Sequence, residues 1–229
     1  MSDKTDEYEQ LSWVFTAWWR GLQSLDGDTG KQILRGSSPV PPDRQSLAQL
    51  RRINVVDYDG TGVVDVGGAL GVSAFRTLIQ RARSQKLNEY SSVRKWLSDE
   101  QSTLEPFVIA AAALARIRED SSDGQARRGA TARLLGQSKT IGESDSLFAE
   151  ARFKRLIRSN DNWPDLMAQA RRVSAILERS APVGDFAASL VLWNADPRIK
   201  RDWSFQYYQR DFEPAGDSAA PPSSPSVSA

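Results

Sequence analysis

The chain has 229 residues, with 30 lysine and arginine residues against 29 acidic residues, and it contains neither histidine nor cysteine. The length suits one large domain or two small ones. The missing residue types exclude Ser-His-Asp and Cys-His nucleophiles, a histidine general base, thiolate or imidazole zinc sites and disulfides. A binding or structural role is therefore favoured over an enzyme, and no cofactor is expected. Because the net charge is only +1, a surface for nucleic acid requires local segregation of charge.

Neither the start of the chain nor its most apolar run indicates a membrane protein. Residues 1–10 are polar and acidic, unlike a signal peptide. The run 106–115 is about half as long as the roughly 20 apolar residues of a membrane span. We therefore expect a soluble cytoplasmic protein in which this run forms a buried core helix.

Helical spacing of apolar residues dominates the N-terminal half, and strand alternation is nearly absent. The pattern predicts three early helices, at 8–25, 29–35 and 45–53. Segment 54–71 is rich in Val, Gly and Asp and predicts a loop, with a short hairpin as the alternative. Helical spacing resumes at Phe75. Residues 102–105 (STLE) fit a capping box at the start of a core helix that runs through Ile117.

The C-terminal half begins after a polar segment, 121–129, which contains two glycines and predicts a linker. Four helices are expected behind it: 147–158, 163–179, 186–193 and 197–208, the last opened by Asp196 as N-cap and Pro197 at the first helical position. Residues 213–229 are rich in Pro, Ser, Ala and Gly and predict disorder. The sequence thus predicts an all-α, two-lobed helical bundle: a lobe over 1–120, a linker over 121–129, a basic bundle over 130–212 and a disordered C-terminal tail.

Positive charge collects in the C-terminal half, where residues 152–210 contain eleven cations against six acids. On a helix, Phe153, Leu156 and Ile157 share one sector, and the cations Lys154, Arg155 and Arg158 fall in the opposite sector. Such a face could contact nucleic-acid phosphates. The alternatives are an ordinary solvated face, or an adaptor that docks an acidic protein.

The seven tryptophans suggest stacking on single-stranded bases as a further possibility. Four of them keep helical register with aliphatic residues and are predicted to lie in the core: Trp18, Trp163, Trp193 and Trp203. Spacing leaves Trp13 and Trp96 undecided.

Segment 57–65 resembles the first half of an EF-hand loop, with oxygen-bearing residues at positions 1, 3, 5 and 9. Position 12, which should be a bidentate Glu, is Gly68. We therefore expect no metal site. A metal-carboxylate enzyme that uses Asp57, Asp59 and Asp65 is the weakest alternative.

The order of the C-terminal features resembles the CasB family, the small subunit of the type I-E CRISPR surveillance complex (Cascade). Segment 151–161 (ARFKRLIRSND) is similar to the family stretch R-F-x-R-L-L-R-x-x-D, and a helix with Asp165-Leu166 and Arg171-Arg172 follows it. The closing segment RIKRDWSFQYY is similar to the family's R-x-W-x-x-x-Y-Y. Nearer the start, AWWRGL and the spacing from Gly30 to Arg35 resemble the family's opening pattern.

The resemblance implies a non-enzymatic helical subunit that lies as a pair along the belly of the complex. Such a subunit holds the guide-RNA/target-DNA duplex and gives the displaced strand a basic path, while base pairing supplies sequence specificity. Cleavage belongs to a separately recruited helicase-nuclease. The partners implied are the backbone and large subunits, the guide RNA, the target DNA with its displaced strand and a second copy of the chain, without a membrane.

The nucleic-acid-binding residues predicted from the resemblance and the charge pattern are all basic: Arg35, Arg51, Arg52, Arg152, Lys154, Arg155, Arg158, Arg171, Arg172, Lys200 and Arg201. Segment 54–71 looks like an insertion relative to shorter members of the family.

Overall fold

The computed structural model describes residues 3–35, 38–58, 61–97, 104–122, 127–137, 146–159 and 162–209. The predicted disordered tail, Asp59 and the first two residues of the predicted capping box lie outside these ranges.

Eleven α-helices make up most of the described chain, which confirms the all-α prediction. Their bounds are α1 Asp3–Leu22, α2 Arg44–Arg52, α3 Val66–Gly71, α4 Ser73–Ser84, α5 Ser91–Leu97, α6 Glu105–Leu114, α7 Ala130–Gly136, α8 Glu150–Ile157, α9 Trp163–Ile176, α10 Val183–Leu192 and α11 Pro197–Tyr208, with a 3-10 turn at Leu87–Glu89. Three small sheets are also described, each of two strands. They pair β1 (Leu34–Arg35) with β2 (Ser38–Pro39), β3 (Val55–Tyr58) with β4 (Thr61–Val64), both antiparallel, and β5 (Glu119–Asp120) with β6 (Ser180–Ala181), parallel.

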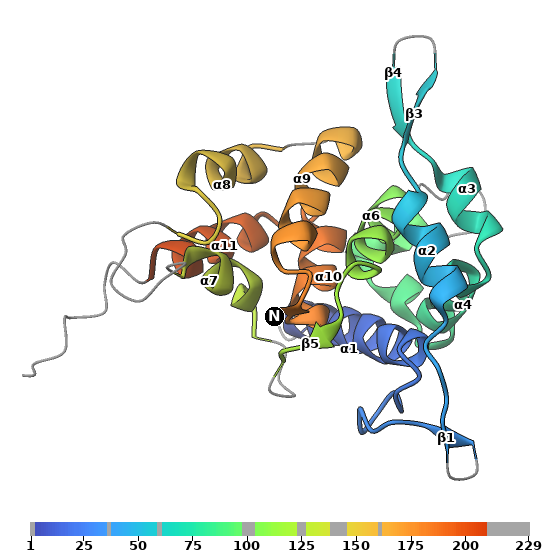
Figure 1. The fold of residues 1–229 in the computed structure, drawn as a ribbon. Helices are drawn as coiled ribbons and strands as arrows, with labels where there is room; N and C mark the ends of the chain where they lie inside the picture. The colour runs from blue at the N-terminus through green and yellow to red at the C-terminus, as the bar shows by residue number, and fades with distance from the viewer. Residues whose placement is uncertain are drawn as a thin grey trace, which may run out of the picture.

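The prediction of a helix at 29–35 is wrong, because the structure describes this whole segment and has no helix in it. Asp26 Oδ1 accepts hydrogen bonds from the backbone N–H and the hydroxyl of Thr29, both at 2.7 Å, and Gly30 has a positive φ of 66°. This local bonding makes a tight turn instead of a helix. The chain then extends into β1, which projects from the body of the molecule (Figure 1).

Segment 54–71 contains the hairpin that was the alternative to a loop, formed by β3 and β4. The hairpin projects from the molecule beside α2 (Figure 1). The short helix α3 that follows it was not predicted. Asp65 opens α3, and its Oδ1 accepts from the backbone N–H of Gly68 at 2.7 Å. The carboxylate of Asp65 therefore caps a helix.

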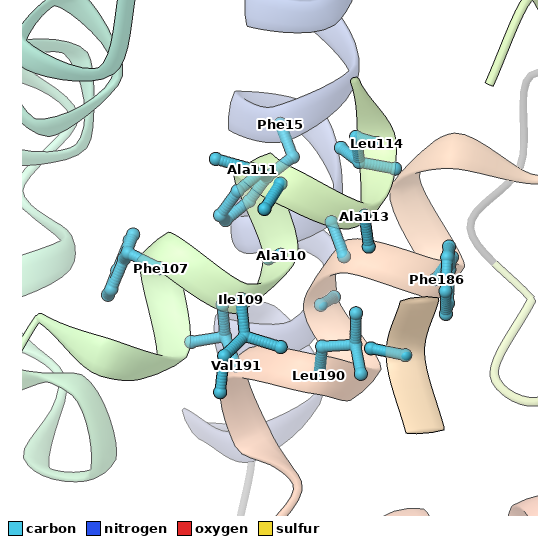
Figure 2. Close-up of a cluster of buried hydrophobic side chains, with 14 of the residues drawn as sticks. Phe15, Phe107, Ile109, Ala110, Ala111, Ala113, Leu114, Phe186, Leu190 and Val191 are labelled. Carbon is cyan, nitrogen blue, oxygen red and sulfur yellow. The ribbon is translucent and has the colours of Figure 1, made fainter. Parts of the chain in front are cut away.

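The core is built around α6, in which every residue from Pro106 to Leu114 is buried. Figure 2 shows α6 crossing α10, with α1 alongside and their apolar side chains between them. Phe15 of α1 stacks on Phe107 of α6 with ring centroids 5.7 Å apart. Among the helices described, none is long and apolar enough to cross a membrane.

The tryptophan predictions are largely confirmed. Trp18, Trp193 and Trp203 are buried, and Trp163 is half-buried. Trp96, which spacing left undecided, is buried and meets Trp163 edge-on at 6.4 Å. Trp13 is 43% exposed.

A buried carboxylate joins α1, α7 and α10. Asp185 of α10 accepts hydrogen bonds from the backbone N–H groups of Gly129 and Thr131, each at 2.7 Å, and from the hydroxyl of Tyr8. Gly129 precedes α7 with a φ of 80° and is the last residue of the predicted linker. The division into two lobes at this linker stays a prediction.

Candidate nucleic-acid interface

Helix α8 presents most of its charge to solvent. Phe153 and Leu156 are buried, whereas Arg152, Lys154 and Arg155 are exposed, as is Arg158 at the C-terminal cap. Phe153 stacks on Tyr207 of α11 with ring centroids 3.8 Å apart, so the apolar side of α8 is held against α11. The four cations are left exposed, and α8 itself lies on the side of the molecule away from α2 (Figure 1).

One acidic residue lies among these cations. Glu150 accepts from Lys154 at 2.7 Å and from the hydroxyl of Tyr208 at 3.1 Å. The hydrogen bond and the charge of Glu150 raise the pKa of Lys154, which Arg158 opposes as a like charge. Residues 150–158 thus contain four cations and one acid, and an excess of positive charge remains.

Lys200 of α11 extends this charged region. Its Nζ donates to the carbonyl of Ser159 and to Asn194 Oδ1, both at 3.3 Å, and lies 5.7 Å from the centroid of the Trp193 ring. Ser159 directly follows Arg158, so Lys200 is fixed beside the end of α8. We call Arg152, Lys154, Arg155, Arg158 and Lys200 the α8 surface. The next residue, Arg201, is exposed and pairs with Asp202 at 3.1 Å.

A second group of cations lies where α2, α6 and α9 meet. Arg171 of α9 donates to Asn54 Oδ1 at 3.0 Å and to the carbonyls of Arg51 and Ile53 at the end of α2. Arg51 in turn donates from Nε to the carbonyl of Ala115 at 2.6 Å. We call Arg51, Arg52, Arg116, Arg171 and Arg172 the junction cluster.

Within the junction cluster, Arg171 is the most constrained cation. Burial lowers its pKa, and the nearby charge of Arg116 lowers it further. Arg172 is exposed and donates to Gln169 Oε1 at 3.1 Å. Arg116 was missed by the sequence analysis, because it belongs to no motif or charge block. The one available signal was its position directly after the most apolar run of the chain.

The structure does not bring all the predicted residues together. Arg35 is exposed on β1, which lies at the opposite end of the molecule from α8 (Figure 1). The predicted residues therefore fall into the α8 surface with its neighbour Arg201, the junction cluster, and the separate Arg35.

The acidic residues considered for a metal site do not gather either. Asp57 lies in β3, Asp65 caps α3, and Asp59 is outside the described residues. In the described part of the chain, no group of three or more potential metal ligands is found.

A groove of about 1270 Å³ lies between α1 and α7. The exposed Trp13 lines it, together with Arg127 and Arg133 and the acidic Glu9 and Asp28. Its lining includes none of the predicted nucleic-acid-binding residues and carries both signs of charge.

The family model described as CRISPR-associated protein Cse2 matches residues 46–208, which is more than half of the chain. The matched range contains the α8 surface and the junction cluster, and Arg35 precedes it. Searches of curated proteins and of solved structures found no match.

Proposed function

We propose that this chain, which belongs to the CRISPR-associated protein Cse2 family, stabilises the opened target DNA through phosphate contacts of its α8 surface. Cse2 and CasB are two names of one family, so the resemblance stated from the sequence is confirmed. Membership makes the chain a non-catalytic small subunit of a type I-E Cascade complex. The contacts with nucleic acid are our inference.

The single observation that carries this proposal is the one-sided charge of α8. Four exposed cations and one acid lie within nine residues, while the apolar side of the helix is buried against α11. Guanidinium and ammonium groups on a rigid helix neutralise strand phosphates and release counterions, without dependence on base sequence. That is what a subunit needs when base pairing with the guide RNA supplies specificity.

Family membership implies that the chain is part of a Cascade complex, but not which partners it contacts there. We propose that the chain contacts the backbone and large subunits, the guide RNA, the target DNA with its displaced strand and a second copy of itself, in the cytoplasm. Strand β1, to which Arg35 belongs, and the hairpin of β3 and β4 both project from the body of the molecule (Figure 1). They suit contacts with neighbouring subunits better than a continuous path along α8.

The experiment is a measurement of R-loop lifetime in the reconstituted complex. Lys154, Arg155 and Arg158 are changed together to Glu. Three surface contacts worth about 0.2–1 kcal/mol each sum to about 0.6–3 kcal/mol, which predicts a lifetime that is shorter by about threefold to 150-fold.

A matched control changes Arg44, Arg94 and Arg179 to Glu, since these three exposed residues lie outside the α8 surface and the junction cluster. The control removes the same charge and is expected to leave the lifetime unchanged. Equal lifetimes for all three complexes, with unchanged circular dichroism, would reject the assignment of the α8 surface.

The rival function, docking of an acidic protein, is tested by competition. Heparin and DNA of unrelated sequence should displace nucleic acid from the α8 surface about equally, because the contacts are to phosphate and charge. An acidic protein held by a shape-specific interface should resist DNA, and that outcome would favour the adaptor.

A further inference from the structure

The C-termini of α2 and α6 meet at the junction cluster, and arginine side chains donate hydrogen bonds to backbone carbonyls at both ends. Arg171 donates to the carbonyls of Arg51 and Ile53 at the end of α2. Arg51 donates to the carbonyl of Ala115, just beyond α6, at 2.6 Å. Cations are favourable at such ends, because the free carbonyls carry a partial negative charge. These donors of Arg171 and the Nε of Arg51 therefore have a structural role.

The positive charge at this place exceeds what the two helix ends can neutralise. The ends together supply about one unit of negative charge. Against this stand the guanidinium groups of Arg51, Arg52, Arg116 and Arg171. The charged group that acts on Arg171 is another cation, Arg116, and both this charge and burial lower the pKa of Arg171. The junction therefore carries an excess of positive charge that a bound anion would relieve.

Arg116 also has a hydrogen-bond donor that finds no partner. Its Nε is buried, and no acceptor within the described residues bonds to it. A buried unpaired donor on a charged group destabilises the fold, because the donor has lost its hydrogen bond to water and has no protein acceptor in its place. An anion at the junction would provide an acceptor once the side chain rotates toward it.

We propose that Arg116 and Arg51 bind one backbone phosphate of the nucleic acid held by the complex. Arg171 is a positioning residue, which fixes the end of α2 and thereby the place of Arg51. The exposed Arg52 and Arg172 directly follow Arg51 and Arg171 in the sequence and add two further cations, and such a group of cations suits a phosphodiester chain better than a single free phosphate. The inference rests on the proposed function, since it assigns a second phosphate contact to the same strand-binding role.

The test replaces Arg116 by Met in the complete complex, which keeps an unbranched apolar side chain in place of the arginine stem but removes the charge and the donors. The expected result is weaker binding of single-stranded and R-loop DNA, with the slope of log K against log[salt] reduced by about one unit. The isolated variant chain should melt at the same temperature or higher, because the unpaired donor and one repulsive charge are gone. The control is Arg94→Met, at an exposed arginine of α5, which should change neither quantity.

Arg171→Met tests the positioning role. The variant should weaken binding, and combining it with Arg116→Met should cost less than the sum of the two, because both act on one phosphate contact. A purely structural Arg171 would lower the melting temperature and leave the affinity of the folded complex unchanged, which would overturn its positioning role.

The remaining outcomes separate this inference from the proposed function. If Arg116→Met lowers the melting temperature and leaves DNA affinity unchanged, Arg116 is structural and the phosphate site is wrong, while the effect of the α8 variants still decides the proposed function. If inorganic phosphate raises the melting temperature of the wild-type chain more than that of Arg116→Met, but DNA affinity is equal, the site takes a free anion and its nucleic-acid role is overturned. If the complex forms an equally stable R-loop without the chain, the proposed function itself fails.

Discussion

The carboxylate of Asp185 accepts a hydrogen bond from the backbone N–H of Thr131 at 2.7 Å, across 54 positions of sequence. Asp185 is completely buried on α10, and Thr131 lies in the first turn of α7. Since α7 packs on α11, which in turn holds α8, this contact lies at the base of the proposed nucleic-acid surface. The contact therefore ties α10 to α7, and α7 packs against α11, the helix that meets α8.

Asp185→Asn should lower the free energy of unfolding by about 2–4 kcal/mol. The amide has one acceptor oxygen where the carboxylate has two, so one of the N–H groups of Gly129 and Thr131 loses its partner. Denaturation in urea followed by circular dichroism measures the change. Asp165→Asn, on the partly exposed first turn of α9, is the control and should cost less than about 1 kcal/mol. Equal midpoints for both variants would contradict a structural role for Asp185.

Gly184→Ala should destabilise the crossing of α1 and α10 by about 1–3 kcal/mol. A Cβ at Gly184 would collide with Ser12 Oγ and lie 2.7 Å from Thr16 Oγ1. Gly21→Ala is the matched control, because a Cβ there meets nothing within 4 Å. Because alanine favours the helix more than glycine does, Gly21→Ala should raise the free energy of unfolding by up to about 1 kcal/mol. Opposite shifts of the melting temperature are expected, and a shift of the same sign in both variants would refute the close approach at Gly184.

Phe153→Ala should lower the free energy of unfolding by about 3–5 kcal/mol. It should also shorten the R-loop lifetime, although Phe153 itself contacts no DNA strand in our proposal. The ring stacks on Tyr207 and carries the apolar side of α8, so its loss releases the α8 surface. Phe205→Ala, at a ring of α11 that is 63% exposed, should change stability by less than about 0.5 kcal/mol and leave the lifetime alone. A full lifetime with Phe153→Ala would show that the orientation of α8 is unimportant.

Asp196 should contribute a pH-dependent part of the stability. Its partial burial acts to raise its pKa, but hydrogen bonds and charge from Arg198, with a smaller part from Arg128, keep the pKa below the usual value. An acid with a lowered folded-state pKa stabilises the fold above its unfolded pKa of about 3.9, and this contribution is lost as pH falls through the lower folded value.

Asp196→Asn keeps an N-cap for α11 but does not ionise in this range. The wild-type chain should therefore be more stable than the variant by about 1 kcal/mol at pH 7, and the difference should shrink as the pH falls below the unfolded pKa of about 3.9. Urea denaturation at a series of pH values measures it. A difference that stays constant with pH would mean that the charge of Asp196 is irrelevant.

The parts of the fold that could be predicted from sequence are those with local causes. Asp196 and Pro197 mark the start of α11, and the spacing of Phe153 and Leu156 indicates which side of α8 is buried. The helix predicted at 29–35 was wrong although its cause is also local, because Asp26 and Gly30 make a turn that the spacing of apolar residues does not reveal. Helices α5 and α7 are seven residues each, too short for a clear periodic signal, and were missed.

The sequence was enough to predict which part of the chain is basic, but not how the cations of the candidate nucleic-acid interface are arranged in space. No local rule places Arg171 against the carbonyls of α2, more than 110 residues away, or Arg116 beside it. The same limit applies to Arg35, whose resemblance to a family position said nothing of β1 extending away from the other cations. Long-range packing decided which of the predicted cations share a surface.

The salt dependence of R-loop binding tests the central claim most directly. The affinity of the reconstituted complex is measured over a range of salt concentrations with the wild-type chain and with Lys154, Arg155 and Arg158 changed to Glu. If α8 contacts strand phosphates, the slope of log K against log[salt] becomes shallower by about two to three units in the variant, with no change in sequence preference. An unchanged slope in a folded, fully assembled variant would contradict the account.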